Sequence, residues 1–113
     1  MPSIDELVKD LTDKLDELQT VARLYDLALD SEKAAQEEFD RIWRMWQFPQ
    51  KDQEGNYQNP PERLNEQLKK ATDDLAEKKR NVQKWKDRLD AAAAAYFAAV
   101  AALSTAIMQL ASR

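Results

Sequence analysis

The stretch that decides the fold is residues 64–110, LNEQLKKATDDLAEKKRNVQKWKDRLDAAAAAYFAAVAALSTAIMQL, where mostly apolar residues recur at alternating intervals of four and three. This alternation is a heptad repeat, which places the recurring residues on one stripe of an α-helix. The stripe runs for almost seven heptads, and Lys78 is its only charged member. Its members are Leu64, Leu68, Ala71, Leu75, Lys78, Val82, Trp85, Leu89, Ala92, Tyr96, Ala99, Leu103, Ala106 and Leu110. The pattern predicts one long helix over about 60–112.

A similar stripe occupies the first part of the chain. Ser3 and Glu6 have the spacing of a capping box, which predicts that a helix begins there. The stripe weakens at Glu32 and Gln36, and apolar residues then resume on a neighbouring face, which we interpret as a change of heptad register. The first set is Ile4, Val8, Leu11, Leu15, Leu18, Ala22, Tyr25 and Leu29, and the second is Ala28, Ala35, Phe39, Ile42, Trp43 and Trp46. Because residues 3–48 contain no Gly or Pro, they are predicted to form a single helix.

Turn-forming residues separate the two predicted helices. Pro49 and Gly55 lie among Asp and Asn residues in a loop over about 49–59, and Asn59 is a candidate N-cap for the second helix. Two long helices joined by about a dozen residues predict an all-α fold, an antiparallel helical hairpin forming one domain over 1–113. Folding the chain about this loop places Trp43 near Leu64. The second helix then extends about ten residues, or about 15 Å, beyond the start of the first.

Composition argues against several classes of function. The chain has no Cys, no His and one Gly, so disulfides, Glu-x-x-His metal sites and Gly-rich phosphate loops are not expected. We therefore expect no catalytic residues, no cofactor, no metal and no enzymatic activity. The net charge of −4 gives no general attraction to nucleic acid, and no nucleic-acid partner is expected. Residues 1–40 carry a net charge of −8 and residues 41–113 one of +4, which favours pairing between the helices.

The Ala-rich tract over 91–112 contains 22 residues and no charge. Its length suits a membrane span, but its six strongly apolar residues contribute only about −3 kcal/mol on an insertion scale, and its polar residues offset much of that. Its heptad spacing and small residues instead favour a helix surrounded by other helices. We expect the chain to form a homo-oligomer, a dimer or larger, within a larger helical bundle. The predicted self-association residues are Val100, Leu103, Ile107, Met108 and Leu110.

Insertion of residues 91–112 into a membrane is the less favoured alternative. The basic run KKRNVQKWKDR, residues 78–88, precedes the tract and could face anionic lipid, with Trp85 at the interface. The acidic residues Asp74, Glu77 and Asp87 dilute the positive charge in and around this run, and an acidic first helix is expected opposite it. The favoured interpretation is therefore a solvated helix face with Trp85 on the stripe.

Aromatic residues cluster at the predicted hairpin tip, in FDRIWRMWQFPQ, residues 39–50. Trp and Arg are enriched at binding hot spots, so the tip is a candidate site for another protein. The candidate residues are Trp43, Arg44, Trp46 and Phe48. The alternative is a local core in which the rings pack on Leu64 and the loop. We expect Trp46 and Phe48 to be the most exposed of the rings.

These patterns predict a non-catalytic interaction or assembly protein, such as a scaffold, adaptor, chaperone or viral or phage assembly factor. No signal peptide is predicted at the N-terminus, so a cytoplasmic location is expected. In size and two-helix plan the chain also resembles small secreted hairpins of the WXG100 kind, which would imply secretion by a non-classical route. Neither Trp43 nor Trp46 is followed by Gly two residues later, so the resemblance assigns no residue a role.

Overall fold

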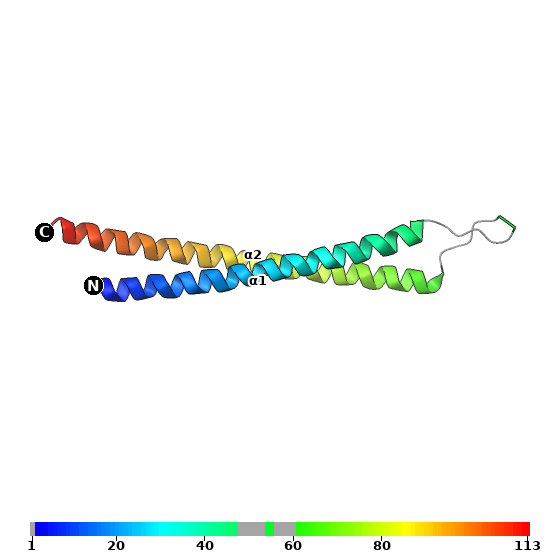
Figure 1. Ribbon diagram of the computed structural model, residues 1–113, viewed down its shortest axis with the longest axis horizontal. Coiled ribbons are helices and arrows are strands. Elements are labelled where there is room, and N and C mark those ends of the chain that lie inside the picture. Colours follow the sequence, from blue (N-terminus) through cyan, green and yellow to red (C-terminus); the bar gives the residue numbers. More distant parts are fainter. Residues whose placement is uncertain (1, 48–53, 56–60) are drawn as a thin grey trace. The chain divides into compact units, whose positions relative to one another are not determined.

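A computed structural model describes residues 2–47, 54–55 and 61–113. Two helices account for almost all of them: α1, Ile4–Gln47, and α2, Glu62–Ala111, of 44 and 50 residues. The described residues contain no strand, and the helices form the predicted antiparallel hairpin (Figure 1). Within the predicted loop, the described residues Glu54 and Gly55 form a turn, in which Gly55 has a φ of 83°. Phe48, Pro49, Asn59 and Pro60 lie outside the described residues.

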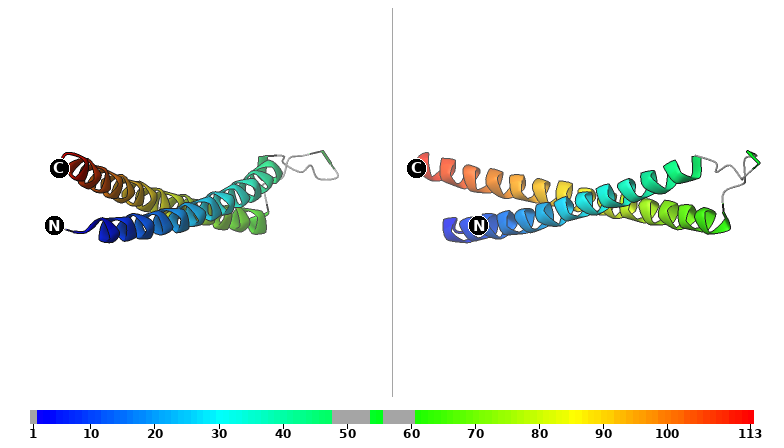
Figure 2. Two further views of the ribbon diagram at one scale, coloured as in Figure 1. Left: turned by 60° about the vertical axis from the view of Figure 1, so that its left-hand side comes forward. Right: turned by 45° about the vertical axis from the view of Figure 1, so that its right-hand side comes forward.

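The hairpin divides into two packing units, each built from both helices. Unit 1 contains Met1–Leu27 and Gln83–Arg113, and unit 2 contains Ala28–Val82. In unit 1 the N-terminal part of α1 lies antiparallel to the C-terminal part of α2, and both chain termini are at the same end of this unit (Figures 1 and 2). In unit 2 the C-terminal part of α1 lies beside the first turns of α2.

The heptad stripe of α2 is confirmed as the face that packs on α1. Its buried members are Ala71, Leu75, Ala92 and Ala99, and the other members as far as Ala106 are half-buried. Small side chains at these positions allow the two helix backbones to approach closely. The last member of the stripe, Leu110, is exposed.

The stripe predicted for the first part of α1 is partly wrong, because Val8, Leu15 and Leu29 are exposed. The packed positions lie one residue earlier, at Leu7, Lys14, Val21 and Ala28, and they continue the same alternation into unit 2. The observed seam is Ile4, Leu7, Leu11, Lys14, Leu18, Val21, Tyr25, Ala28, Glu32, Ala35, Phe39, Ile42 and Trp46. Its intervals alternate between three and four throughout α1, so the predicted change of register does not occur.

The residues of α1 and α2 that lie opposite each other also differ from the prediction. In unit 2 the indole Nε1 of Trp46 donates a hydrogen bond of 2.7 Å to Oδ1 of Asn65, so Trp46, and not Trp43, lies closest to the start of α2. In unit 1 burial on α2 ends at Ala106, and α2 is exposed from Ile107 onward. The extension of α2 beyond α1 is therefore shorter than the ten residues predicted.

Local hydrogen bonds explain where both helices begin. The Ser3 hydroxyl accepts a hydrogen bond of 3.2 Å from the Glu6 amide, as the capping pattern predicts. At α2 the carbonyl of Pro61 accepts from the amides of Leu64 and Asn65, so this helix begins with Glu62 after a residue that has no amide hydrogen to satisfy.

Replacement of the cap, Ser3→Ala, should lower the free energy of unfolding by about 1 kcal/mol, because an amide of the first turn loses its acceptor. Urea unfolding followed by circular dichroism at one fixed protein concentration measures this change. Thr20→Ala is the matched control, since the Thr20 hydroxyl donates its hydrogen bond to the Asp16 carbonyl in the interior of the same helix. An equal loss of stability in both variants would contradict a specific capping role for Ser3.

Candidate functional site

Unit 1 leaves most of its apolar surface uncovered. Among its described residues only two are buried, the alanines Ala92 and Ala99, whereas unit 2 also buries Ile42 and Leu75. Seven of the ten exposed large apolar side chains in the described chain belong to unit 1. These seven are Val8, Leu15, Leu27, Phe97, Ile107, Met108 and Leu110. An isolated pair of helices cannot cover side chains that point away from the shared seam, and surfaces of this kind mark interaction sites.

The positions of these side chains in the heptad show which side of unit 1 is apolar. With the seam at positions a and d, positions e and b lie on one flank of each helix, and positions g and c lie on the other. The e and b positions of unit 1 bring together large apolar residues from both helices. We call this set the apolar flank: Val8 and Leu15 from α1, and Ala93, Phe97, Val100 and Ile107 from α2. Phe97 is 66% exposed, the highest value for a large apolar side chain among the residues that the structure describes.

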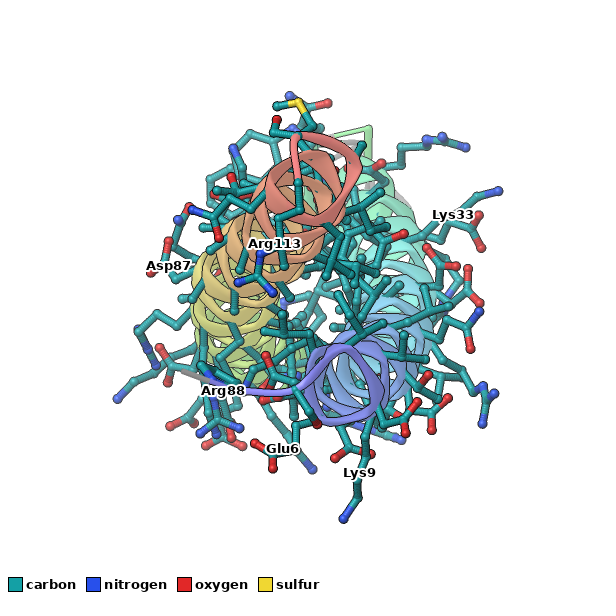
Figure 3. The ribbon with its side chains drawn as sticks, turned by 90° about the vertical axis from the view of Figure 1, so that its left-hand side faces the viewer. Glu6, Lys9, Lys33, Asp87, Arg88 and Arg113 are labelled. Atoms are coloured by element: carbon teal, nitrogen blue, oxygen red, sulfur yellow. The ribbon has the colours of Figure 1, made fainter. Side chains whose placement is uncertain are left out.

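The opposite flank of unit 1 has a different chemistry. A shallow groove of about 490 Å³ lies there, and its lining includes Glu17, Arg88 and Ala95, which are g positions of the two helices. This lining shows that the g positions of both helices share one side, so the e positions share the other. The groove exists because Ala91, Ala92 and Ala95 leave space beside the large ring of Trp85. Figure 3 shows the charged side chains of Lys9 and Asp87 pointing outward from unit 1.

The predicted self-association residues differ in how exposed they are and in which face of α2 they occupy. Ile107, Met108 and Leu110 are exposed, as predicted, whereas Val100 and Leu103 are half-buried within the hairpin. Val100 and Ile107 belong to the apolar flank. Met108 lies on the side of α2 opposite the seam, and Leu110 continues the seam beyond α1.

Four residues of the apolar flank, Val8, Leu15, Ala93 and Phe97, were missed by the sequence-based prediction. Val8 and Leu15 were assigned to the seam itself, and their exposure becomes apparent only once the seam of α1 is placed correctly. Phe97 lies next to Tyr96, with ring centroids 5.8 Å apart, and the stripe of α2 passes through Tyr96. An apolar residue off the stripe in an otherwise small-residue tract is the signal that could have identified Phe97.

The aromatic residues of unit 2 form a row along α1. The Phe39 and Trp43 rings stack with centroids 6.2 Å apart, and Trp43 stacks on Trp46 at 5.2 Å. Trp46 is half-buried and hydrogen-bonded to Asn65, so the prediction that Trp46 is among the most exposed rings is wrong. Trp43 is the more exposed ring, at 37%. The structure thus supports a local packing role for Trp46 and leaves Trp43 available on the surface.

The basic residues around this row are exposed. Arg44 has no ion pair within the described part of the chain, whereas Arg41 donates hydrogen bonds to both carboxylate oxygens of Glu38. The bonded guanidinium lowers the pKa of the Glu38 carboxyl, and the carboxylate raises the pKa of Arg41. Phe48, the fourth candidate residue of the tip, lies outside the described residues.

The basic run of α2 packs locally around its aromatic residue. Trp85 is half-buried on the seam, as the favoured interpretation predicts. The Arg88 guanidinium lies 4.7 Å from the centre of the Trp85 ring, and the Lys84 ammonium lies 5.6 Å from it. These cation–π contacts give the two basic residues a structural role. Among residues 2–47, 54–55 and 61–113, no group of three or more carboxylates is positioned to hold a metal ion.

The Ala-rich part of α2 is long and apolar enough to cross a membrane by length and composition, and only 11% of the relevant 18-residue window is buried in the hairpin. The same test is passed by core helices of soluble proteins, which are mostly buried. Most of this window is therefore left uncovered by the hairpin itself. Comparison of the chain with protein-family models, with curated proteins and with solved structures finds no match.

Proposed function

We propose that this chain is a non-catalytic assembly protein that forms a homo-oligomer through unit 1, with the apolar flank as the contact surface. The observation that carries the proposal is the concentration of seven exposed large apolar side chains in a unit whose described residues include only two buried ones, both alanines. Four of the seven, Val8, Leu15, Phe97 and Ile107, lie on the apolar flank. Full burial of a Leu, Ile, Phe or Met side chain contributes about 1.5–3 kcal/mol, so covering these side chains is a substantial driving force. A second hairpin would complete a four-helix bundle.

In detergent-free buffer, the purified chain should sediment as a dimer or larger oligomer. Analytical ultracentrifugation across a dilution series measures the mass and the dissociation constant together. Because apolar burial drives association, the oligomer should persist when the salt concentration is raised. A strictly monomeric, soluble chain at every concentration would contradict self-association.

Membrane association is the second candidate function, and one observation favours it: the candidate span in α2 is only 11% buried. The two candidates differ in what covers Phe97 and Ile107, which would be another hairpin in one case and lipid in the other. Recovery of the chain only in detergent, with cosedimentation on lipid vesicles, would support insertion and count against the oligomer.

The aromatic row is proposed as the contact for a further protein. Trp43 is 37% exposed, its neighbour Met45 is 43% exposed, and Arg44 lies exposed between them. Large aromatic, Met and Arg side chains together are typical of protein-binding surfaces. An assembly protein with one surface for its own copies and another for a partner corresponds to a scaffold or adaptor.

A further inference from the structure

We infer that two copies of the chain pack through their apolar flanks in the same orientation, with unit 1 of α1 on each copy lying over unit 1 of α2 on the other. This inference rests on the proposed self-association and specifies its geometry. The alternative places the copies in opposite orientations, so that α1 lies over the partner's α1 and α2 over the partner's α2. Both arrangements bring apolar residues together, so the orientation must be decided by charge.

The two helix segments of unit 1 carry opposite net charges. Residues 4–27 of α1 contain seven acidic and three basic residues, a net charge of −4. Residues 83–111 of α2 contain three basic and two acidic residues, a net charge of +1. On the side of the apolar flank, the e and b positions of α1 carry Asp5 and Asp26, and those of α2 carry Lys86 and Asp90. Opposite orientations would place the two carboxylates of α1 against those of its own copy, whereas the same orientation places them against a helix face with no net charge.

Single charged residues at the edge of the apolar flank also favour the same orientation. In the groove, Val21 lies beside Trp85 and Arg88, which places Lys86 at about the level of Val21, roughly one helical turn from Asp26 along unit 1. Lys86 is an e position and Asp26 a b position, so both lie on the side of the apolar flank. In the same orientation, Lys86 of each copy lies on the helix that faces Asp26 of the other, about one helical turn away along the axis. In opposite orientations, Asp26 of α1 has only the partner's acidic α1 beside it.

Cross-linking can test the orientation directly, because the chain has no Cys and each introduced thiol is unique. Two variants, Leu15→Cys and Ala93→Cys, place a thiol on the apolar flank of α1 and of α2. Packed helix axes lie about 8–10 Å apart, so a bifunctional maleimide of about that length can join facing positions. One variant carries a size tag, and the two are mixed, dissociated in denaturant, refolded together and cross-linked.

The same orientation predicts that the mixed cross-link between the two variants exceeds each homotypic cross-link by far more than the about twofold excess that random pairing gives. Leu27→Cys, on the other flank, should cross-link with neither variant. Predominant homotypic products would overturn the inference and establish opposite orientations. If no cross-link forms although the chain still sediments as an oligomer, the apolar flank is not the contact surface, and only the proposed self-association is retained. A monomeric mass would instead refute the proposed function.

Discussion

Phe97→Glu should convert the oligomer into a monomer whose helix content is unchanged. Phe97 is 66% exposed in the hairpin, so the substitution removes little packing within one chain. In the bundle the same position is covered, and an unpaired carboxylate there costs about 3 kcal/mol or more per chain. For a dimer, which carries two such sites, the dissociation constant should rise by about ten-thousandfold or more, since each 1.4 kcal/mol is a factor of ten. Ultracentrifugation gives the mass, and circular dichroism gives the helix content.

Leu27→Glu is the matched control for this experiment. Leu27 is also in unit 1 and is 58% exposed, but it lies at a c position on the other flank. The same change of charge should therefore leave the mass unaltered. If both variants dissociate, the effect comes from added negative charge on an acidic protein and not from a defined surface. If neither dissociates, the apolar flank is not the contact.

The packed face of α2 could be predicted from the sequence because a single set of its residues forms a continuous heptad stripe. Polar and charged residues occupy most other positions before Asp90, so the stripe through Leu64, Leu75 and Leu89 has no competitor there. In the Ala-rich tract most positions are Ala, so hydropathy does not distinguish one face of the helix from another. The stripe extends into it only by continuing the same alternation, and the burial of Ala92 and Ala99 confirms it.

The seam of α1 could not be predicted with the same accuracy, since two adjacent columns of its heptad are apolar. At one level the choice lies between Lys14 and Leu15, and at another between Ala28 and Leu29, and hydropathy favours the wrong residue each time. Lys14 can occupy the seam because its aliphatic stem packs while its ammonium group reaches water. Ala28 occupies the seam because a small side chain there allows the two helices to pack closely. The displaced leucines are the residues that become exposed.

This misplacement also explains why part of the candidate surface was missed. Assigning Val8 and Leu15 to the seam removes them from the predicted surface, which leaves the Ala-rich tract as the whole predicted contact region. The surface in the structure is instead shared between both helices. The position of this surface depends on the antiparallel pairing, which places the e positions of α1 and α2 on the same flank. Neither helix alone shows this.

Trp46→Ala should lower the free energy of unfolding by about 2 kcal/mol, which for a chain of this size corresponds to a fall of about 8 °C in the melting temperature. The half-buried indole packs beside the start of α2, stacks on Trp43 at 5.2 Å, and holds Asn65 through its Nε1 hydrogen bond. All three contacts are lost together. Thermal unfolding at one fixed protein concentration, followed by circular dichroism, measures the change.

Trp43→Ala is the comparison that separates packing from partner binding in the aromatic row. Trp43 loses the same stack but donates no hydrogen bond to α2 within the described residues, and it is already 37% exposed. Its loss should cost about 1 kcal/mol or less. In a pull-down from the native cell, this variant should lose the protein captured by the unsubstituted chain. Equal destabilisation by both substitutions, with capture unchanged in Trp43→Ala, would make the whole row a local core and leave the apolar flank as the chain's proposed binding surface.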